Sequence, residues 1–105
     1  MNKIAFLNDG LRRTFSRGRV VMTAGVAALP EEKLAQVLDR IRHFDEFTKD
    51  NDSYGQHDFG SFAIDGQDYF FKIDYYSSDM QAGSEVPADP QKTTRVLTIM
   101  RADEY

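Results

Sequence analysis

Apolar residues recur at helical spacing near the start of the chain. This stripe consists of Ile4, Leu7, Leu11 and Phe15. A period of three to four residues predicts an amphipathic helix, and Asn2 stands where a capping side chain is preferred. Gly18 follows the stripe, and glycine readily takes the left-handed conformation that ends a helix. The pattern predicts a helix that begins after Asn2 and ends within Ser16–Gly18.

A second apolar stripe follows Pro30. Proline fits the first turn of a helix, and Glu31 and Glu32 favour the positive end of its dipole. Basic residues gather at the other end, where they favour the negative end of the dipole. The stripe consists of Leu34, Val37, Leu38, Ile41 and Phe44, and the basic residues are Arg40, Arg42, His43 and Lys49. The pattern predicts a helix that buries one face.

Four further segments have the β-branched and aromatic composition typical of strands. They are residues 19–23, 59–64, 69–76 and 95–100. Asp65 and Gly66 separate the second and third strands, and this dipeptide is a strong signal for a two-residue hairpin turn. A polar loop is expected at residues 48–57 and an irregular connection at residues 77–93.

The element order is therefore α-β-α-β-β-β, which predicts a single α+β domain over residues 1–105. The three later strands are expected to form an antiparallel sheet. The first strand would lie at an edge or pair with the third or fourth strand, giving three to four strands in all. Both helices would pack on one face of the sheet.

The third strand presents two different faces. Tyr69, Phe71, Ile73 and Tyr75 form an apolar set that we expect beneath the helices. The alternate set mixes rings with charges and consists of Phe70, Lys72, Asp74 and Tyr76. Exposed rings suit base stacking or a protein interface, unless the first strand or residues 77–93 cover them. We expect a partner-binding surface that comprises Asp65, Asp68, Phe70, Asp74, Tyr76 and Asp79.

Composition narrows the possible chemistry. The 105 residues include no cysteine, which excludes disulfides, thiolate zinc sites and thiol nucleophiles. A chain without cysteine fits a reducing compartment, so we expect a cytoplasmic protein. No apolar run approaches the roughly 20 residues of a membrane helix, and no signal-peptide core is present. No glycine-rich phosphate cradle is found, so no nucleotide or other cofactor is implied.

The chain has a formal net charge of −4, and its two halves differ in charge. Residues 1–49 carry nine basic and six acidic side chains, whereas residues 50–105 carry four basic and eleven acidic ones. The first half contains a basic cluster of Arg12, Arg13, Arg17 and Arg19. This cluster could bind phosphate or pair with acidic loops of the same chain. The acidic second half disfavours nucleic acid as the main partner.

Two groups of residues are candidates for chemistry. Asp50, Asp52 and Asp58 partly imitate a calcium-binding loop, but the alternative is that Asp50 and Asp52 cap turns. His57, Asp58, Lys72 and Asp74 could form an acid–base cluster if residues 57–59 pair with the third strand. The alternative for this second group is a charged network on the sheet surface, or a histidine that locks the loop.

Four motifs resemble a small bacterial family of domains of unknown function, frequent on plasmids and other mobile elements. They are Leu7-Asn8-Asp9 with Arg12, the loop Asp50–Gly60, Lys72–Tyr76 and Thr94–Tyr105. The usual loop of that family reads Asp-Pro-Tyr-Gly-Glu-His, whereas this chain has Ser53 and Gln56. The resemblance implies a shared fold and no particular activity.

These observations favour a small acidic, non-catalytic protein-binding module. A more specific form is a mobile-element inhibitor that binds a host nucleic-acid-handling defence complex, similar in role to an anti-CRISPR protein. One alternative is a small enzyme or metal-binding protein that uses the 50–58 loop with Lys72 and Asp74. The second alternative is a nucleic-acid-binding domain that uses the arginine cluster with Phe70 and Tyr76.

Overall fold

The sheet and helices follow the predicted order in the structure, a computed structural model that describes residues 2–105. The helices are α1 (Lys3–Thr14), α2 (Ala24–Ala27) and α3 (Glu31–Arg42), with a final 3-10 turn, η1 (Ala102–Glu104). The strands are β1 (Arg19–Met22), β2 (Phe59–Ile64), β3 (Gln67–Ser77) and β4 (Thr93–Arg101). The α+β class is confirmed, and α2 is an element that the sequence did not predict.

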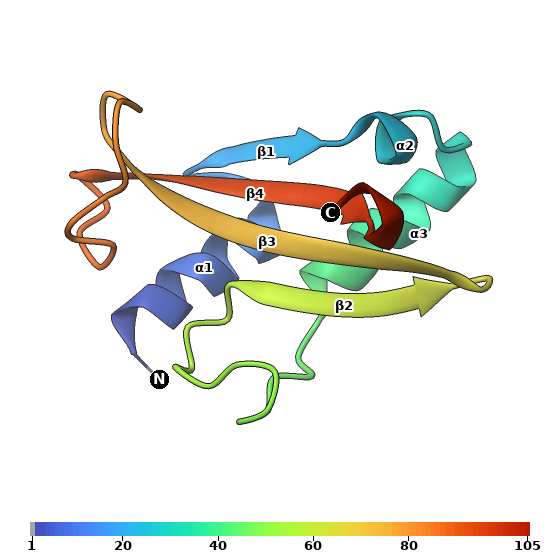
Figure 1. Cartoon of the computed structure of the whole chain (residues 1–105), viewed down its shortest axis with the longest axis horizontal. Helices are drawn as coiled ribbons and strands as arrows, with labels where there is room; N and C mark the ends of the chain where they lie inside the picture. Colours follow the sequence, from blue (N-terminus) through green and yellow to red (C-terminus); the bar gives the residue numbers. More distant parts are fainter. Residues whose placement is uncertain (1) are drawn as a thin grey trace.

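The four strands form one sheet in the order β1-β4-β3-β2 (Figure 1). Strand β3 is antiparallel to both of its neighbours, β2 and β4, as predicted. The expectation of a purely antiparallel sheet is wrong, because β1 pairs with β4 in parallel. The reason lies in the connection: α3 carries the chain back along the sheet, so that β2 starts at the end where β1 started. Of the places expected for β1, the structure shows an edge of the sheet and pairing with the fourth strand.

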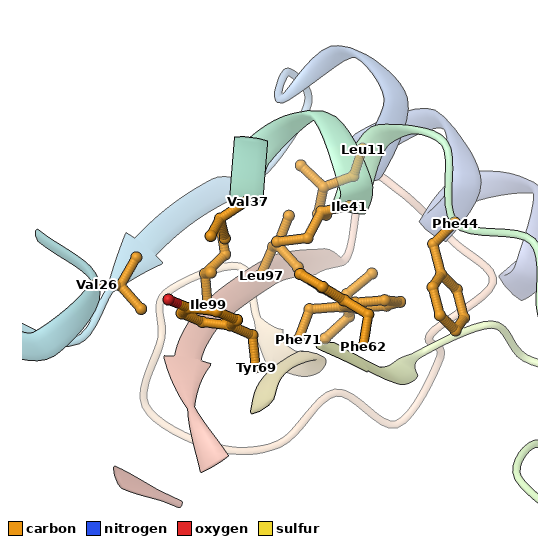
Figure 2. Packing of buried hydrophobic residues seen from close by; sticks show 11 residues of the cluster. Leu11, Val26, Val37, Ile41, Phe44, Phe62, Tyr69, Phe71, Leu97 and Ile99 are labelled. Atoms are coloured by element: carbon orange, nitrogen blue, oxygen red, sulfur yellow. The ribbon is translucent and has the colours of Figure 1, made fainter. Parts of the chain in front are cut away.

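Both long helices pack on one face of the sheet, where a single apolar core forms (Figures 1 and 2). Leu11 of α1 and Ile41 of α3 lie over Phe71 in the middle of β3. The apolar set predicted for β3 is confirmed: Tyr69, Phe71 and Ile73 are buried, and Tyr75 packs against the core from the margin. These residues alternate with the outward set because side chains of a strand point to opposite faces.

The buried face of α1 differs from the predicted apolar stripe. Ala5 and Leu11 are buried, but the other residues that face inward are polar: Asn8, Asp9 and Arg12. Phe6, by contrast, is 68% exposed. Asn2 caps the helix as predicted, since its side chain accepts a hydrogen bond from the amide of Ala5 at 2.7 Å. The helix ends at Thr14, and Phe15 caps it with a left-handed φ of 54°. This end lies before the predicted range, Ser16–Gly18.

The hairpin between β2 and β3 has the predicted turn. Asp65 (φ 51°) and Gly66 (φ 81°) both take left-handed conformations, as a two-residue turn of this twist requires. The carboxylate of Asp65 forms an ion pair with Lys33 of α3. No helix within residues 2–105 has both the length and the apolar character needed to cross a lipid bilayer.

Candidate functional site

Arg12 of α1 occupies the centre of a buried polar network. Its side chain is 1% exposed, and its Nη2 lies 2.7 Å from the equally enclosed carboxylate of Asp9. Nη1 donates to the carbonyl oxygens of Ile41 and Phe44, at 2.9 and 2.7 Å, where α3 ends. The guanidinium also lies against the rings of Phe47 and Phe71. Such a charge can stay buried because it is paired and hydrogen-bonded.

His57 joins this network from the polar loop between α3 and β2. Its Nδ1 lies 3.0 and 3.1 Å from the two carboxylate oxygens of Asp9. Its ring stacks on Phe47, with a centroid distance of 4.1 Å and an angle of 3° between planes. Its backbone φ is 58°, and Asp52 supports this conformation by accepting hydrogen bonds from the amides of Gln56 and His57. Asp52 thus closes the loop, and His57 attaches the loop to Asp9 of α1.

A second branch of the network joins α1 to β3 and β4. Asn8 donates to the hydroxyl of Tyr75 at 2.7 Å and to the carbonyl of Gln56 at 3.0 Å. Its amide oxygen accepts from Nε of the buried Arg95 at 2.8 Å. Tyr75 in turn donates to the carboxylate of Asp58 at 3.0 Å. Desolvation lowers the pKa of Arg95 below its ordinary value.

The network resembles a proton-transfer site in its residue types but not in its access. A histidine oriented by a carboxylate can act as an acid or base when its second nitrogen reaches a substrate. Here the nearest charged group to Nε2 of His57 is the carboxylate of Asp52, at 3.8 Å. The best-formed surface hollow, about 280 Å³, is lined along α1 by residues that include Phe6, Asp9 and Arg17, so it reaches the partner of His57 but not His57 itself. The geometry therefore indicates that His57 locks the loop.

The structure does not bring the four candidate catalytic residues together. His57 and Asp58 bond to side chains on the helix side of the sheet, Asp9 and Tyr75. Lys72 and Asp74 project from the other face of β3, where they pair with each other at 2.9 Å. This pairing raises the pKa of Lys72. Strand alternation separates the two halves of the predicted cluster, because residues 72 and 74 face away from Tyr75.

Of the three candidate calcium ligands, one has the turn-capping role that the sequence left open. Asp52 binds backbone amides, and Asp58 binds Tyr75. Asp50 is exposed, and it lies in a turn. Among the residues that the structure describes, no three acidic or histidine side chains are grouped as metal ligands would be.

Tyr75 gives the network a testable response to alkaline pH. Burial raises the pKa of its hydroxyl well above the ordinary 10.0, although the Asn8 hydrogen bond opposes the shift. Above pH 10 the unfolded chain therefore releases this proton more readily than the folded one, so stability must fall as pH rises. The limiting slope for one proton is about 1.4 kcal/mol per pH unit, and solvent screening of this half-buried group reduces it.

We expect Tyr75→Phe to make the loss of stability between pH 10 and 11.5 shallower than in the unsubstituted protein. Thermal unfolding followed by circular dichroism measures this slope. Tyr54→Phe is the control, since Tyr54 is 84% exposed and should leave the profile unchanged. Equal slopes for Tyr75→Phe and the parent protein would contradict the assignment.

The outward face of the sheet, onto which Figure 1 looks, carries neither α1 nor α3, and the short turn η1 lies over β3 and β4 at one end of it. By strand alternation this face presents Asp68, Phe70, Asp74 and Tyr76 of β3, so four of the six predicted partner-binding residues share it. The other two lie elsewhere: Asp65 pairs with Lys33 at the hairpin, and Asp79 bonds to Ser77 in the turn after β3.

Aromatic rings lie at one end of this face and an ion pair at its middle. Phe70 contacts Phe59 and the C-terminal Tyr105, at centroid distances of 5.3 and 5.8 Å. The side chains of Lys72 and Asp74 remain 41% and 39% exposed beside them. The face thus combines half-buried rings with accessible charge, a combination that protein interfaces favour.

The predicted arginine cluster is divided by the fold. Arg12 points into the core and pairs with Asp9, so it does not lie with the other three arginines. Arg13, Arg17 and Arg19 remain exposed near the end of α1 and in β1.

The acidic side chains of the second half are dispersed rather than gathered into one patch. Asp52 and Asp58 belong to the buried network. Asp103 pairs with Arg101, and Glu104 bonds to Thr23. These four acids are thus engaged in local contacts in separate parts of the fold.

The chain is therefore an α+β domain in which a buried polar network, and not a pocket, unites the motif residues. A family described as proteins of unknown function, DUF3768, matches residues 22–104, and the chain belongs to this family. The expected membership of an uncharacterised family is confirmed to that extent. No curated protein and no solved structure matches the chain.

Proposed function

We propose that this protein is a non-catalytic binding module that contacts another protein through the outward face of its sheet. The observation that carries the proposal is the division between the two faces. On the helix side, His57 and its neighbours are engaged with one another. On the other side, Phe70, Tyr76 and the Lys72–Asp74 pair lie on a face that neither α1 nor α3 covers.

A more specific form of the proposal is an inhibitor carried on a mobile element that binds a host nucleic-acid-handling defence complex in the cytoplasm. The resemblance of the motifs to a mobile-element family supports this form by analogy. Because the acids are dispersed, such an inhibitor would act through the ring-bearing face rather than by imitating a phosphate backbone. Direct binding of nucleic acid has less support, since Asp68 and Asp74 lie on the same face as the rings.

The test is affinity capture from a bacterial lysate at low salt, with the immobilised protein and a variant of this face. Asp74→Lys/Tyr76→Ser is expected to reduce capture of a specific partner at least about tenfold, because interface anchors of this kind dominate binding. Glu32→Lys is the matched control, since it changes an exposed acid at the start of α3. Equal capture by all three proteins would contradict the proposed surface.

Two further measurements separate the alternatives. The inhibitor form predicts that the captured assembly handles nucleic acid, and failure to capture any such assembly would count against it. A gel shift at low salt with single- and double-stranded probes should show no retarded band. A retarded band that Phe70→Ser/Tyr76→Ser removes would favour the nucleic-acid-binding alternative instead.

A further inference from the structure

Strand β1 is an edge strand with an apolar, exposed surface. All four of its residues are exposed, and Val20, Val21 and Met22 are 36%, 47% and 40% exposed. Their neighbours in β4 show which face each occupies, because Val20 and Met22 lie beside the core residues Leu97 and Ile99. Arg19 and Val21 therefore belong to the outward face.

The backbone of β1 has hydrogen-bonding capacity directed away from the sheet. The amide of Thr23 donates to the carbonyl of Ile99 at 3.0 Å. In a parallel pair alternate residues bond to the neighbour, so Val21 also faces β4 while Val20 and Met22 point their amides and carbonyls outward. Within residues 2–105 no other element bonds to these outward groups. The opposite edge is different, since Arg40 donates to the carbonyl of Ala63 in β2.

We propose that the β1 edge binds a second copy of this chain, in a twofold-symmetric antiparallel pair that continues the sheet across the dimer. Residues that face each other must lie on the same face of the joined sheet. More than one twofold register meets this condition, and we take the one centred on Val21, which brings oppositely charged ends of the two strands together. It places Val21 opposite Val21 of the second copy and Val20 opposite Met22. The second pairing is hydrogen-bonded, because the backbone groups of Val20 and Met22 are the ones that point outward.

Charge complementarity selects a second copy as the occupant. In this register Arg19 lies opposite Thr23 of the second copy, and both belong to the outward face. The Thr23 hydroxyl donates to the carboxylate of Glu104 at 2.7 Å, and the amide of Gly25 donates to the same carboxylate at 2.8 Å. The turn η1 thus holds an acid at the far end of β1 (Figure 1). Antiparallel pairing places Glu104 of each copy near Arg19 of the other copy. This contact therefore occurs twice in each dimer.

The length of β1 sets the strength of this dimer. A pairing of four residues buries less area than a standard protein interface, so we expect a weak, concentration-dependent association. The inference goes beyond the proposed binding function, because it concerns the edge of the sheet and does not need any other protein. A purified sample therefore tests it without reference to capture from a lysate.

The first test is sedimentation equilibrium of the intact protein up to about 200 µM, a range that suits a weak interface. We expect a mass that rises toward twice 12.0 kDa. Val20→Pro should raise the dissociation constant roughly ten- to a hundredfold, because each copy loses one intermolecular amide bond and none to β4. Val20→Thr keeps the amide and is the matched control. A single-chain mass throughout, or an unchanged dimer in Val20→Pro, would overturn the proposal.

The second test does not depend on how well the proline variant folds. Across an antiparallel pair that is not hydrogen-bonded, opposite Cα atoms lie about 4.5 Å apart, within the range that a disulfide spans. Since the chain has no cysteine, Val21→Cys introduces the only thiol. We expect a cross-linked dimer in a glutathione redox buffer, and none for Lys49→Cys in the exposed loop. Equal cross-linking of the two variants would refute the register. If the protein stays monomeric and its β1 edge binds an added acidic peptide, the partner at this edge is another protein and not a second copy.

Discussion

Replacing Arg12 with methionine is expected to lower the free energy of unfolding by about 3–5 kcal/mol, the loss typical of breaking a buried ion pair. The substitution keeps a long side chain against Phe47 and Phe71 but removes the charge that neutralises Asp9. It also removes the charged donor from the carbonyl oxygens of Ile41 and Phe44, although the Ile41 oxygen still accepts from the amide of Phe44 at 3.4 Å. Urea unfolding followed by circular dichroism measures the change.

Two controls make this prediction specific. Arg13→Met is the same substitution one residue later, at an exposed position, and should change stability by no more than about 0.5 kcal/mol. Asp9→Asn/Arg12→Met removes both charges and should be more stable than Arg12→Met alone, because no buried charge is left unpaired. Equal losses for the Arg12 and Arg13 variants would mean that the network does not stabilise the fold.

Adding a single methyl group at Gly60 should cost about 3 kcal/mol, at the upper end of the range for an overpacked core. A Cβ atom built at this position would lie 2.3 Å from Cε2 of Phe71 and 2.8 Å from Cε1 of Phe44. Both rings are buried, and they meet edge to face at a centroid distance of 5.3 Å. Neither ring can withdraw without disturbing the core, so Gly60→Ala should shift the urea midpoint strongly.

Gly10→Ala provides the contrasting glycine. A Cβ at Gly10 meets nothing within 4 Å, and the residue lies inside α1. Because alanine is the better helix former, this variant should gain about 0.5–1 kcal/mol. If both glycine variants changed stability in the same direction, the packing explanation for Gly60 would fail.

The long polar motif of the chain owes its residue types to structure more than to chemistry. The Asp50–Gly60 loop contains a histidine, several acids and glycines, a composition that also occurs in active sites and metal sites. In the folded chain Asp52 closes this loop, His57 attaches it to Asp9, and Gly60 lets two rings approach. A segment without regular structure needs such bonds, because its backbone amides have no ladder to satisfy them.

Local patterns were sufficient to predict the two long helices and the four strands, but not the short elements α2 and η1. The capping role of Asn2, the start of α3 after Pro30 and the Asp65–Gly66 turn all depend on neighbouring residues alone, and each is observed. The same holds for the inward face of β3, because strand alternation needs no knowledge of the partner strands. These features depend on interactions between residues that are close in the sequence, so the sequence alone predicts them.

Contacts between distant segments decided the rest. Whether Arg12 lies in the core or on the surface depends on Asp9 beside it and on the carbonyls at the end of α3, which the fold brings to it. The parallel pairing of β1 with β4 depends on the path of α3. His57 is separate from Lys72 because His57 lies on the helix side of the sheet and Lys72 lies on the outward face. Burying a charge is favourable only when its partners are in place, and those partners come together only when the chain has folded.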